Sequence, residues 1–258
     1  NQAARRLEEK IKNNESLRKE LNAVKKEARE KAKKIALNIP NLKDCKYHLG
    51  DAKKGDQSTI FLTEGQSASG SIVSSRDVYT QAVFSLRGKP QNVFGRSRAA
   101  LYRNEELYNM MQALGIEEGV DGLRYARIVI ATDADYDGFH IRNLLLTFFL
   151  NYFEELVVAG RVFILETPLF RVRNKKHTRY CYTPKERVQA EKEISQPEVT
   201  RFKGLGEISP KEFGQFIGED IRLLPVNVNT LKTIPGTMEF YMGKNSPERR
   251  AFIMENLV

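Results

Sequence analysis

The sequence contains few of the residues that build disulfide frameworks and zinc sites. Cysteine occurs only at Cys45 and Cys181, and histidine only at His48, His140 and His177. The two cysteines are too few and too far apart for a disulfide framework or a thiolate metal site, and the histidines do not cluster along the chain. We therefore expect no zinc, and a protein that works in the reducing setting of the cytosol.

Long apolar runs are missing as well. The longest, Leu144–Leu150, is far shorter than the roughly 20 residues that a bilayer requires, and Arg142, Asn143 and Glu154 surround it. This run predicts a buried core helix. The chain opens on Asn1 with no apolar signal segment, and the lack of an initiator Met suggests a fragment excised from a longer protein.

Positive charge is in excess and is concentrated at one end of the chain. The formal net charge is +9, and residues 1–35 contain twelve Lys or Arg against six Glu, which is +6. Lys and Arg neutralise phosphates and release condensed counterions, so this balance suits a polyanion such as nucleic acid. A basic helix is equally compatible with a solvated face, and charge alone leaves both alternatives open.

The order of apolar patterns predicts an α/β protein. With 258 residues, of which 41% are apolar, the chain can form one or two domains. Apolar residues mostly three or four apart predict a long helix in the first segment. Short apolar runs then alternate with helical stretches, which is typical of a parallel sheet flanked by helices. Strands are expected near residues 59–63, 82–86, 127–132 and 162–166, and helices near residues 67–75, 104–114 and 138–158.

The last third of the chain contains two well-marked helix starts. Ser209 can cap a helix, Pro210 fits its first turn, and Glu212 can complete a capping box. Ser246–Pro247 repeats the cap and the proline. We divide the chain into a helical segment over residues 1–35, an α/β domain over residues 36–175 and a mixed C-terminal domain over residues 176–258.

The most informative segment is RIVIATDADYDG, in which a β-branched strand leads directly into Asp133, Asp135 and Asp137. Three carboxylates at alternate positions point to one side if the chain stays extended. Such crowding is electrostatically unfavourable unless a cation or water screens it, and hard divalent ions favour carboxylate oxygens. The segment indicates a metal site, with a solvated acidic turn ending at Gly138 as the alternative.

The same letters imitate the start of an EF-hand calcium loop. That loop requires a bidentate glutamate at its twelfth position, which is Leu144 here, and a helix before it, where this chain has a strand. The calcium-loop interpretation therefore fails.

A fourth acid, Glu64, ends the first strand in IFLTEGQSASG. In a parallel sheet the two strand ends could lie side by side, which would bring Glu64 near the aspartates. One Mg²⁺ usually takes one or two protein carboxylates, so four acids suffice for one site or two, with a phosphate or phosphodiester as substrate. The turn lacks the ending of a P-loop, and Ser69 stands where a serine-hydrolase elbow needs glycine, so a plain strand-to-helix turn is the alternative.

Glu64–Gly65 after one strand and Asp133, Asp135 and Asp137 after a later one resemble the TOPRIM signature of topoisomerases, bacterial primases and some nucleases. The segments EGQSASGS, LRGKPQNV, TDADYDGFHIRNLLLTFF, RFKGLGE and YMGKNSPERRAF resemble consecutive landmarks of bacterial gyrase and topoisomerase IV B subunits. Their order and spacing match from about Lys31 to the end. RFKGLGE is a feature of the topoisomerase B subunits, and it favours them over primases and nucleases.

This resemblance implies a TOPRIM, Rossmann-like fold over residues 36–175, preceded by the end of the transducer region and followed by the tail domain. It implies that Glu64, Asp133, Asp135 and Asp137 bind Mg²⁺, and that Glu64 acts as an acid or base at the leaving oxygen. It also implies that a tyrosine of the A subunit attacks a phosphate of double-stranded DNA in an A2B2 assembly, so that no nucleophile of this chain would be required. ATP would act only through an ATPase region that this chain lacks.

Other matched positions concern DNA and the surroundings of the acids. Lys89 and Asn92 match positions near the cleaved DNA, where a cation would contact the phosphate backbone without reading sequence; ordinary surface residues are the alternative.

Gln66 and Ser69 replace the aspartate and glycine of the usual EGDSAGG, and Tyr136 and Phe139 replace smaller residues around the aspartates. The four acids expected to bind the metal are all retained. Gln66 stands where quinolone-type inhibitors of the family bind nearby, so the sequence does not determine drug sensitivity or the fine placement of DNA.

The resemblance implies a bacterial, cytoplasmic and nucleoid-associated protein with no membrane partner. Two other functions stay open from the sequence: a self-sufficient TOPRIM nuclease or primase, and a structural docking module built on the basic helix and the tail. The absence of a long insertion between Thr167 and Arg201 favours topoisomerase IV, although some gyrases lack it too.

Overall fold

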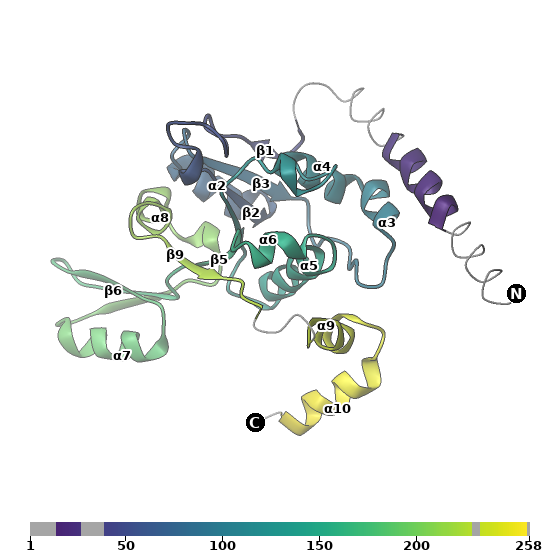
Figure 1. The fold of residues 1–258 in the computed structure, drawn as a ribbon. Coiled ribbons are helices and arrows are strands. Elements are labelled where there is room, and N and C mark those ends of the chain that lie inside the picture. Colours follow the sequence, from purple (N-terminus) through teal and green to yellow (C-terminus); the bar gives the residue numbers. More distant parts are fainter. Residues whose placement is uncertain (1–13, 27–38, 229–232, 257–258) are drawn as a thin grey trace, which may run out of the picture.

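A six-stranded sheet forms the centre of the computed structural model, which describes residues 14–26, 39–228 and 233–256 (Figure 1). Its strand order is β1-β3-β2-β4-β5-β9, and the four inner strands are parallel while both edge strands run antiparallel. The inner strands are β2 (Thr59–Glu64), β3 (Gln81–Leu86), β4 (Arg127–Ala131) and β5 (Val162–Glu166), and the edges are β1 (Leu42–Lys43) and β9 (Arg222–Pro225). The expected parallel sheet and its four strands are confirmed.

Helices cover both faces of this sheet. The layer on one face contains α4 (Glu105–Leu114) and α5 (Tyr136–Tyr152), and the layer on the other contains α2 (Gly65–Ser75) and α8 (Pro210–Ile217). Ile60 of β2 packs into the first layer and its neighbour Phe61 into the second, because successive strand residues point to opposite faces. Strands buried on both faces appear in the sequence as continuous apolar runs.

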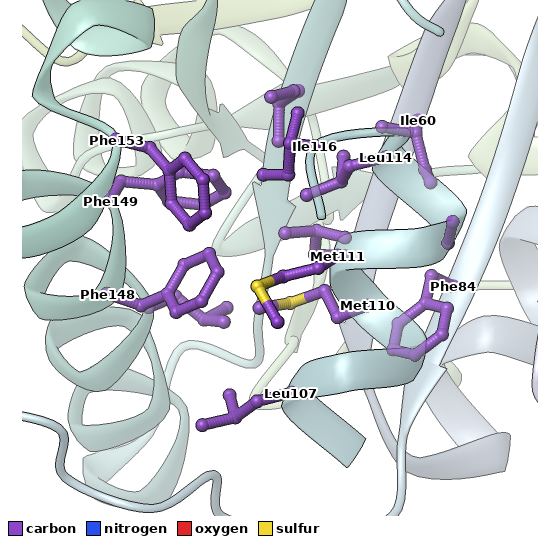
Figure 2. Close-up of a cluster of buried hydrophobic side chains, with 14 of the residues drawn as sticks. Ile60, Phe84, Leu107, Met110, Met111, Leu114, Ile116, Phe148, Phe149 and Phe153 are labelled. Atoms are coloured by element: carbon purple, nitrogen blue, oxygen red, sulfur yellow. The ribbon is translucent and has the colours of Figure 1, made fainter. Parts of the chain in front are cut away.

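The larger core lies between the sheet and the layer of α4 and α5. Figure 2 shows Met110 and Met111 of α4 facing Phe148 and Phe149 of α5, with Ile60 at one side of the cluster. All five side chains are essentially inaccessible to solvent. This packing fixes α5 against the sheet, and therefore fixes the position of its N-terminus.

The expectation of one helix over residues 138–158 is wrong in two respects. The helix begins earlier, at Tyr136, and it is interrupted at Phe153, whose backbone (φ −140°, ψ 41°) is not helical. A separate short helix, α6 (Glu154–Val158), follows. The Phe153 ring is fully buried beside Phe148, with ring centroids 5.1 Å apart, so core packing sets the break.

The helix expected over residues 104–114 is α4, and Asn104 caps it by accepting a hydrogen bond from the Leu107 amide at 3.0 Å. A short helix that was not expected, α3 (Arg98–Arg103), precedes it. Of the helix expected over residues 1–35, the structure describes residues 14–26, which are helical; the rest lies outside the described residues. This helix contacts α3 through an ion pair between Glu20 and Arg103 at 2.9 Å.

The last third of the chain first leaves the main sheet and then returns to it. A three-stranded antiparallel sheet packs against α7 (Pro184–Glu193) and stands apart from the main sheet in Figure 1. Its strands are β6 (Phe170–Arg173), β7 (Thr178–Cys181) and β8 (Glu198–Arg201). The chain then adds α8 and β9 to the main layers. The proposed division at residues 175 and 176 thus assigns two elements of the central body to the C-terminal part.

Both helix starts expected in this third are present. Ser209 accepts a hydrogen bond from the Glu212 amide at the start of α8, and Ser246–Pro247 opens α10 (Ser246–Asn256). Before α10 lies α9 (Ile234–Met242), which follows β9. Among the described residues, no helix has the length and apolar character needed to cross a bilayer.

Candidate active site

The sheet brings Glu64 and the aspartate segment to one edge. Strands β2 and β4 are parallel neighbours, with Thr63 opposite Ala131, so Glu64 and the residues after Ala131 leave the sheet at the same carboxyl end. Gly65 then has a φ of +64°, a left-handed conformation that glycine adopts without strain, and this turns the chain directly into α2. Ligands of open α/β sheets bind beyond such strand ends.

Asp133 is held by a distant loop. Its Oδ1 accepts a hydrogen bond from the Leu205 amide at 2.8 Å, and the Ala134 amide donates to the Lys203 carbonyl at 3.0 Å. Burial raises the pKa of the Asp133 carboxyl, and the charges of Asp135 and Glu207 add to this, while the Leu205 amide opposes it. The loop RFKGLGE therefore forms one wall of the site.

Asp135 and Asp137 belong to the start of α5. Asp135 is the N-cap, and its Oδ1 accepts from the Gly138 amide at 2.8 Å, while Asp137 lies in the first helical turn. The three aspartates are thus not the continuous extended run that would point to one side. The backbone changes from extended at Asp135 to helical at Tyr136, because the cap hydrogen bond starts the helix there.

Lys89 lies beside the acids. Its Nζ is 2.6 Å from Asp137 Oδ1, and both side chains are exposed. The hydrogen bond from Lys89 lowers the pKa of Asp137, and the same hydrogen bond raises the pKa of Lys89. The structure therefore places a cation from the loop after β3 against an acid of α5.

Asn92 has a different environment from Lys89. Its Nδ2 donates to the Met242 carbonyl at 2.9 Å, and its Oδ1 accepts from the Phe94 amide at 3.1 Å. The first of these bonds attaches the loop after β3 to the end of α9, and the second lies within the loop. A DNA contact by Asn92 stays a prediction.

Glu64 is the acid with an unsatisfied oxygen. Burial raises the pKa of the Glu64 carboxyl, and the charges of Asp133, Asp135 and Asp137 raise it further, while Lys89 lowers it. Its Oε2 is buried and has no hydrogen-bond partner among the described residues. A buried carboxylate oxygen without a partner is unfavourable, and a bound cation would relieve this. The donor set, all carboxylate oxygen, fits a hard ion such as Mg²⁺.

A second group of possible ligands lies elsewhere and does not fit a metal ion. Within the described chain, only Asp44, Cys45 and His48 form a group of three or more such residues with ligand atoms all within 4.8 Å of one another. Arg124 already occupies this group, 2.8 Å from His48 Nε2 and ion-paired with Asp44, whose Oδ1 also accepts from Tyr125 at 2.6 Å. Burial raises the pKa of the Cys45 thiol to about 11, so it is protonated. Glu64 and the aspartates do not form so tight a group.

Sequence reasoning did not identify the residues that shape the acidic edge. A Cβ at Gly138 would lie 2.1 Å from the Asp133 carbonyl oxygen, and one at Gly204 would lie 2.9 Å from Asp133 Oδ2. Both glycines stand in segments that the sequence singles out, TDADYDG and RFKGLGE. The presence of a glycine in each of these segments was the signal that the sequence offered. That both glycines contact Asp133 could be seen only in the folded structure.

The fold and this edge define the class of protein. A parallel sheet with carboxylates at adjacent strand ends is the TOPRIM arrangement, and residues 59–167 match the Toprim domain family. These residues contain Glu64, Asp133, Asp135 and Asp137, together with the helices α2 to α6.

Comparison with known proteins narrows this class. The chain is 62% identical to the B subunit of DNA topoisomerase 4 from Borreliella burgdorferi, in a match that covers 99% of this chain and 43% of that protein. It is 34% identical to the B subunit of DNA gyrase from Archaeoglobus fulgidus, over 89% of this chain and 38% of that protein. The crystal structure of the Plasmodium falciparum topoisomerase II DNA-binding, cleavage and re-ligation domain superposes with a TM-score of 0.71 and 26% identity, covering 86% of this chain and 32% of that one.

The chain belongs to the bacterial type IIA topoisomerase B-subunit family and contains its TOPRIM portion. It spans less than half the length of either of these two B subunits.

Proposed function

We propose that this chain supplies the metal-binding half of a DNA cleavage and religation site in a type II topoisomerase. The observation that carries the proposal is the buried, unpartnered Oε2 of Glu64 at a sheet edge shared with Asp133, Asp135 and Asp137. Four carboxylates raise one another's free energy unless a cation lies among them. The relatives named as topoisomerase subunits point to DNA as the polyanion that the cation serves.

Glu64, Asp133, Asp135 and Asp137 would hold Mg²⁺. Bound there, the ion supplies Lewis-acid stabilisation of the charge that develops on the 3′ oxygen leaving the phosphate. Glu64 stands at the end of β2 and would hold or move the proton of that oxygen. The Leu205 amide orients the Asp133 carboxylate, and Lys89 would contact a backbone phosphate once DNA replaces Asp137 as its partner.

The nucleophile would come from a partner. The relatives are named as B subunits, and we propose that this chain works with an A subunit whose tyrosine attacks the DNA phosphate, in an A2B2 assembly. Its overall use would be ATP-driven strand passage, with ATP bound in a part of the protein that this chain does not contain. The setting proposed for this reaction is the bacterial cytoplasm, in association with the nucleoid.

Topoisomerase IV is favoured over gyrase, because identity to the Borreliella topoisomerase 4 protein is 62% and identity to the Archaeoglobus gyrase protein is 34%. A self-sufficient nuclease or primase shares the metal chemistry but is not favoured. Asp133 is held by the RFKGLGE loop, which is a landmark of the topoisomerase B subunits rather than of primases or nucleases.

The test is a cleavage assay on duplex DNA with the full-length protein that carries this sequence, its A subunit and Mg²⁺. Protein-linked double-strand breaks are expected, and Glu64→Ala should reduce them by on the order of a hundredfold or more. Glu166→Ala is the matched control, because Glu166 likewise ends a parallel strand, β5, which is separated from β2 by β4, and it should cleave normally. Undiminished cleavage by Glu64→Ala would remove its catalytic role, and breaks made without the A subunit would favour a nuclease.

A further inference from the structure

The aspartates of the candidate site flank an aromatic side chain that lies almost fully in solvent. Tyr136 is 93% exposed, the highest value among the large hydrophobic residues that the structure describes. It lies between Asp135 and Asp137 in the chain and is the first residue of α5. A single exposed apolar side chain is ordinary, whereas a contiguous exposed apolar patch commonly marks a binding surface.

A second exposed aromatic lies on the same side of α5. Phe139 is 48% exposed and stands three residues after Tyr136, so the two share one helix face. Gly138 and Ile141, in contrast, are buried. The exposed stripe continues through His140 and Asn143. We call Tyr136 and Phe139 the aromatic pair.

Cations as well as the acids of the candidate site surround the aromatic pair, which fits a partner that carries phosphate groups once a divalent ion neutralises the acids. The Arg142 guanidinium lies 5.2 Å from the centroid of the Phe139 ring, and Lys89 lies against Asp137, next in the chain to Tyr136. His140 belongs to the same stripe and is close enough to Asp137 to interact with its charge. A nucleotide offers both features. Its phosphate would lie at the acids, and its flat, weakly polar base would lie against the aromatic pair.

We infer that the aromatic pair contacts the sugar or base next to the phosphate held at the acids, and thereby sets which DNA positions are cleaved. This rests on the proposed function. Because Tyr136 stands between Asp135 and Asp137 in the chain, a phosphate bound at the acids would bring its own nucleotide within reach of the ring. Stacking of an aromatic side chain on a base is tolerant of sequence but depends on how readily that base leaves its stack, which differs between base steps. Tyr136 is a positioning residue and takes no part in the chemistry.

The experiment uses the complex of the full-length protein with its A subunit, Mg²⁺ and one long duplex. Two quantities are measured: the map of protein-linked ends along the duplex, and the dissociation constant for a short duplex by fluorescence anisotropy. Tyr136→Ala should weaken DNA binding by on the order of tenfold and flatten the preferences among cleavage positions. Tyr136→Phe keeps the ring and should retain the wild-type map.

Tyr79→Ala is the matched control. Tyr79 is 47% exposed, but it precedes β3 at the amino end of the sheet, opposite to the edge that carries the acids. This variant should leave both the map and the affinity unchanged. The proposal also expects the association of the A and B subunits without DNA to be the same for wild type and Tyr136→Ala.

Three results would overturn the inference. An unchanged map and affinity in Tyr136→Ala, with normal cleavage by the wild type, would show that the ring is an ordinary surface group and would leave the proposed function intact. Weaker association of the two subunits would assign the pair to a protein interface. Absence of metal-dependent cleavage by the wild type would remove the proposed function and this inference together.

Discussion

Gly138 packs on the main chain of Asp133, where a Cβ at position 138 would lie 2.8 Å from the Asp133 carbonyl carbon and 2.9 Å from its amide nitrogen. The neighbours are backbone atoms, which no side-chain rotation can move. The start of α5 and the end of β4 are therefore held in contact by a residue without a side chain. The glycine that closes TDADYDG sets the distance between Asp133 and the two aspartates of the helix.

We predict that Gly138→Ala destabilises the fold by about 1–3 kcal/mol, because the overpacked helix start must shift. The same shift should displace Asp137 and weaken Mg²⁺-dependent cleavage. Gly70→Ala is the control, since a Cβ there meets nothing within 4 Å in the middle of α2, and alanine favours a helix over glycine. Urea unfolding of both variants measures the effect, and equal stabilities would contradict the packing argument.

Gly204→Ala is predicted to separate metal affinity from stability. The new Cβ would lie 2.9 Å from Asp133 Oδ2, so the carboxylate must move away from its bond with the Leu205 amide. Because the clash is with the end of a side chain, the loss of stability should be small. The concentration of Mg²⁺ at half-maximal cleavage should rise several-fold.

The control for this change is Gly236→Ala in α9, where a Cβ meets nothing within 4 Å. That variant should keep the wild-type dependence on Mg²⁺. If Gly204→Ala has the same half-maximal concentration as the wild type, Asp133 is not positioned by the RFKGLGE loop.

The sequence predicts best those strands that are buried on both faces. Strands β2 and β4 are covered on both faces, so their central residues form the unbroken apolar runs IFL and IVIA, and their ends were found to within a residue or two. The break at Phe153 was missed because an apolar residue fits both a continuing helix and a core contact. Only the packing of Phe153 against Phe148 distinguishes these two outcomes.

The site was predictable where it depends on neighbouring strands and not where it depends on distant loops. The placement of Glu64 near the aspartates follows from the parallel pairing of β2 and β4. The contact of Leu205 with Asp133 joins residues 72 positions apart, and that of Lys89 with Asp137 joins residues 48 apart. No periodicity or cap signal connects such pairs. Resemblance to a family marked these segments as landmarks without indicating which atoms meet.

Acid should destabilise the protein through Glu212. Burial raises the pKa of this carboxyl, but hydrogen bonds from Ser209, Arg171 and Tyr180 outweigh burial and lower the pKa from 4.5 to about 2. The carboxyl is thus more acidic in the folded chain than in the unfolded chain. Its contribution to stability is fully present above about pH 4.5 and is lost as the pH falls towards 2.

Glu212→Gln should therefore lower the free energy of unfolding by about 1–3 kcal/mol at pH 7, and the difference from wild type should shrink as the pH falls from 4.5 towards 2. Glu198→Gln is the control, because the ion pair of Glu198 with Arg173 is exposed and screened, and its effect should be slight. Urea unfolding at several pH values measures both. A difference for Glu212→Gln that is constant with pH would contradict the electrostatic account.

Lys89 is predicted to contribute one phosphate contact and no sequence information. When DNA binds, Lys89 Nζ is expected to leave the carboxylate of Asp137 and to contact a DNA phosphate instead. Without this lysine, DNA binding should release one counterion fewer. Lys89→Ala should weaken binding about equally for duplexes of different sequence, and should reduce the slope of log affinity against log salt by about one. Lys185→Ala, on α7 beyond the small sheet, should leave the slope unchanged. Affinities measured at several salt concentrations decide the matter: an unaltered slope for Lys89→Ala would mean that Lys89 stays paired with Asp137 when DNA is bound.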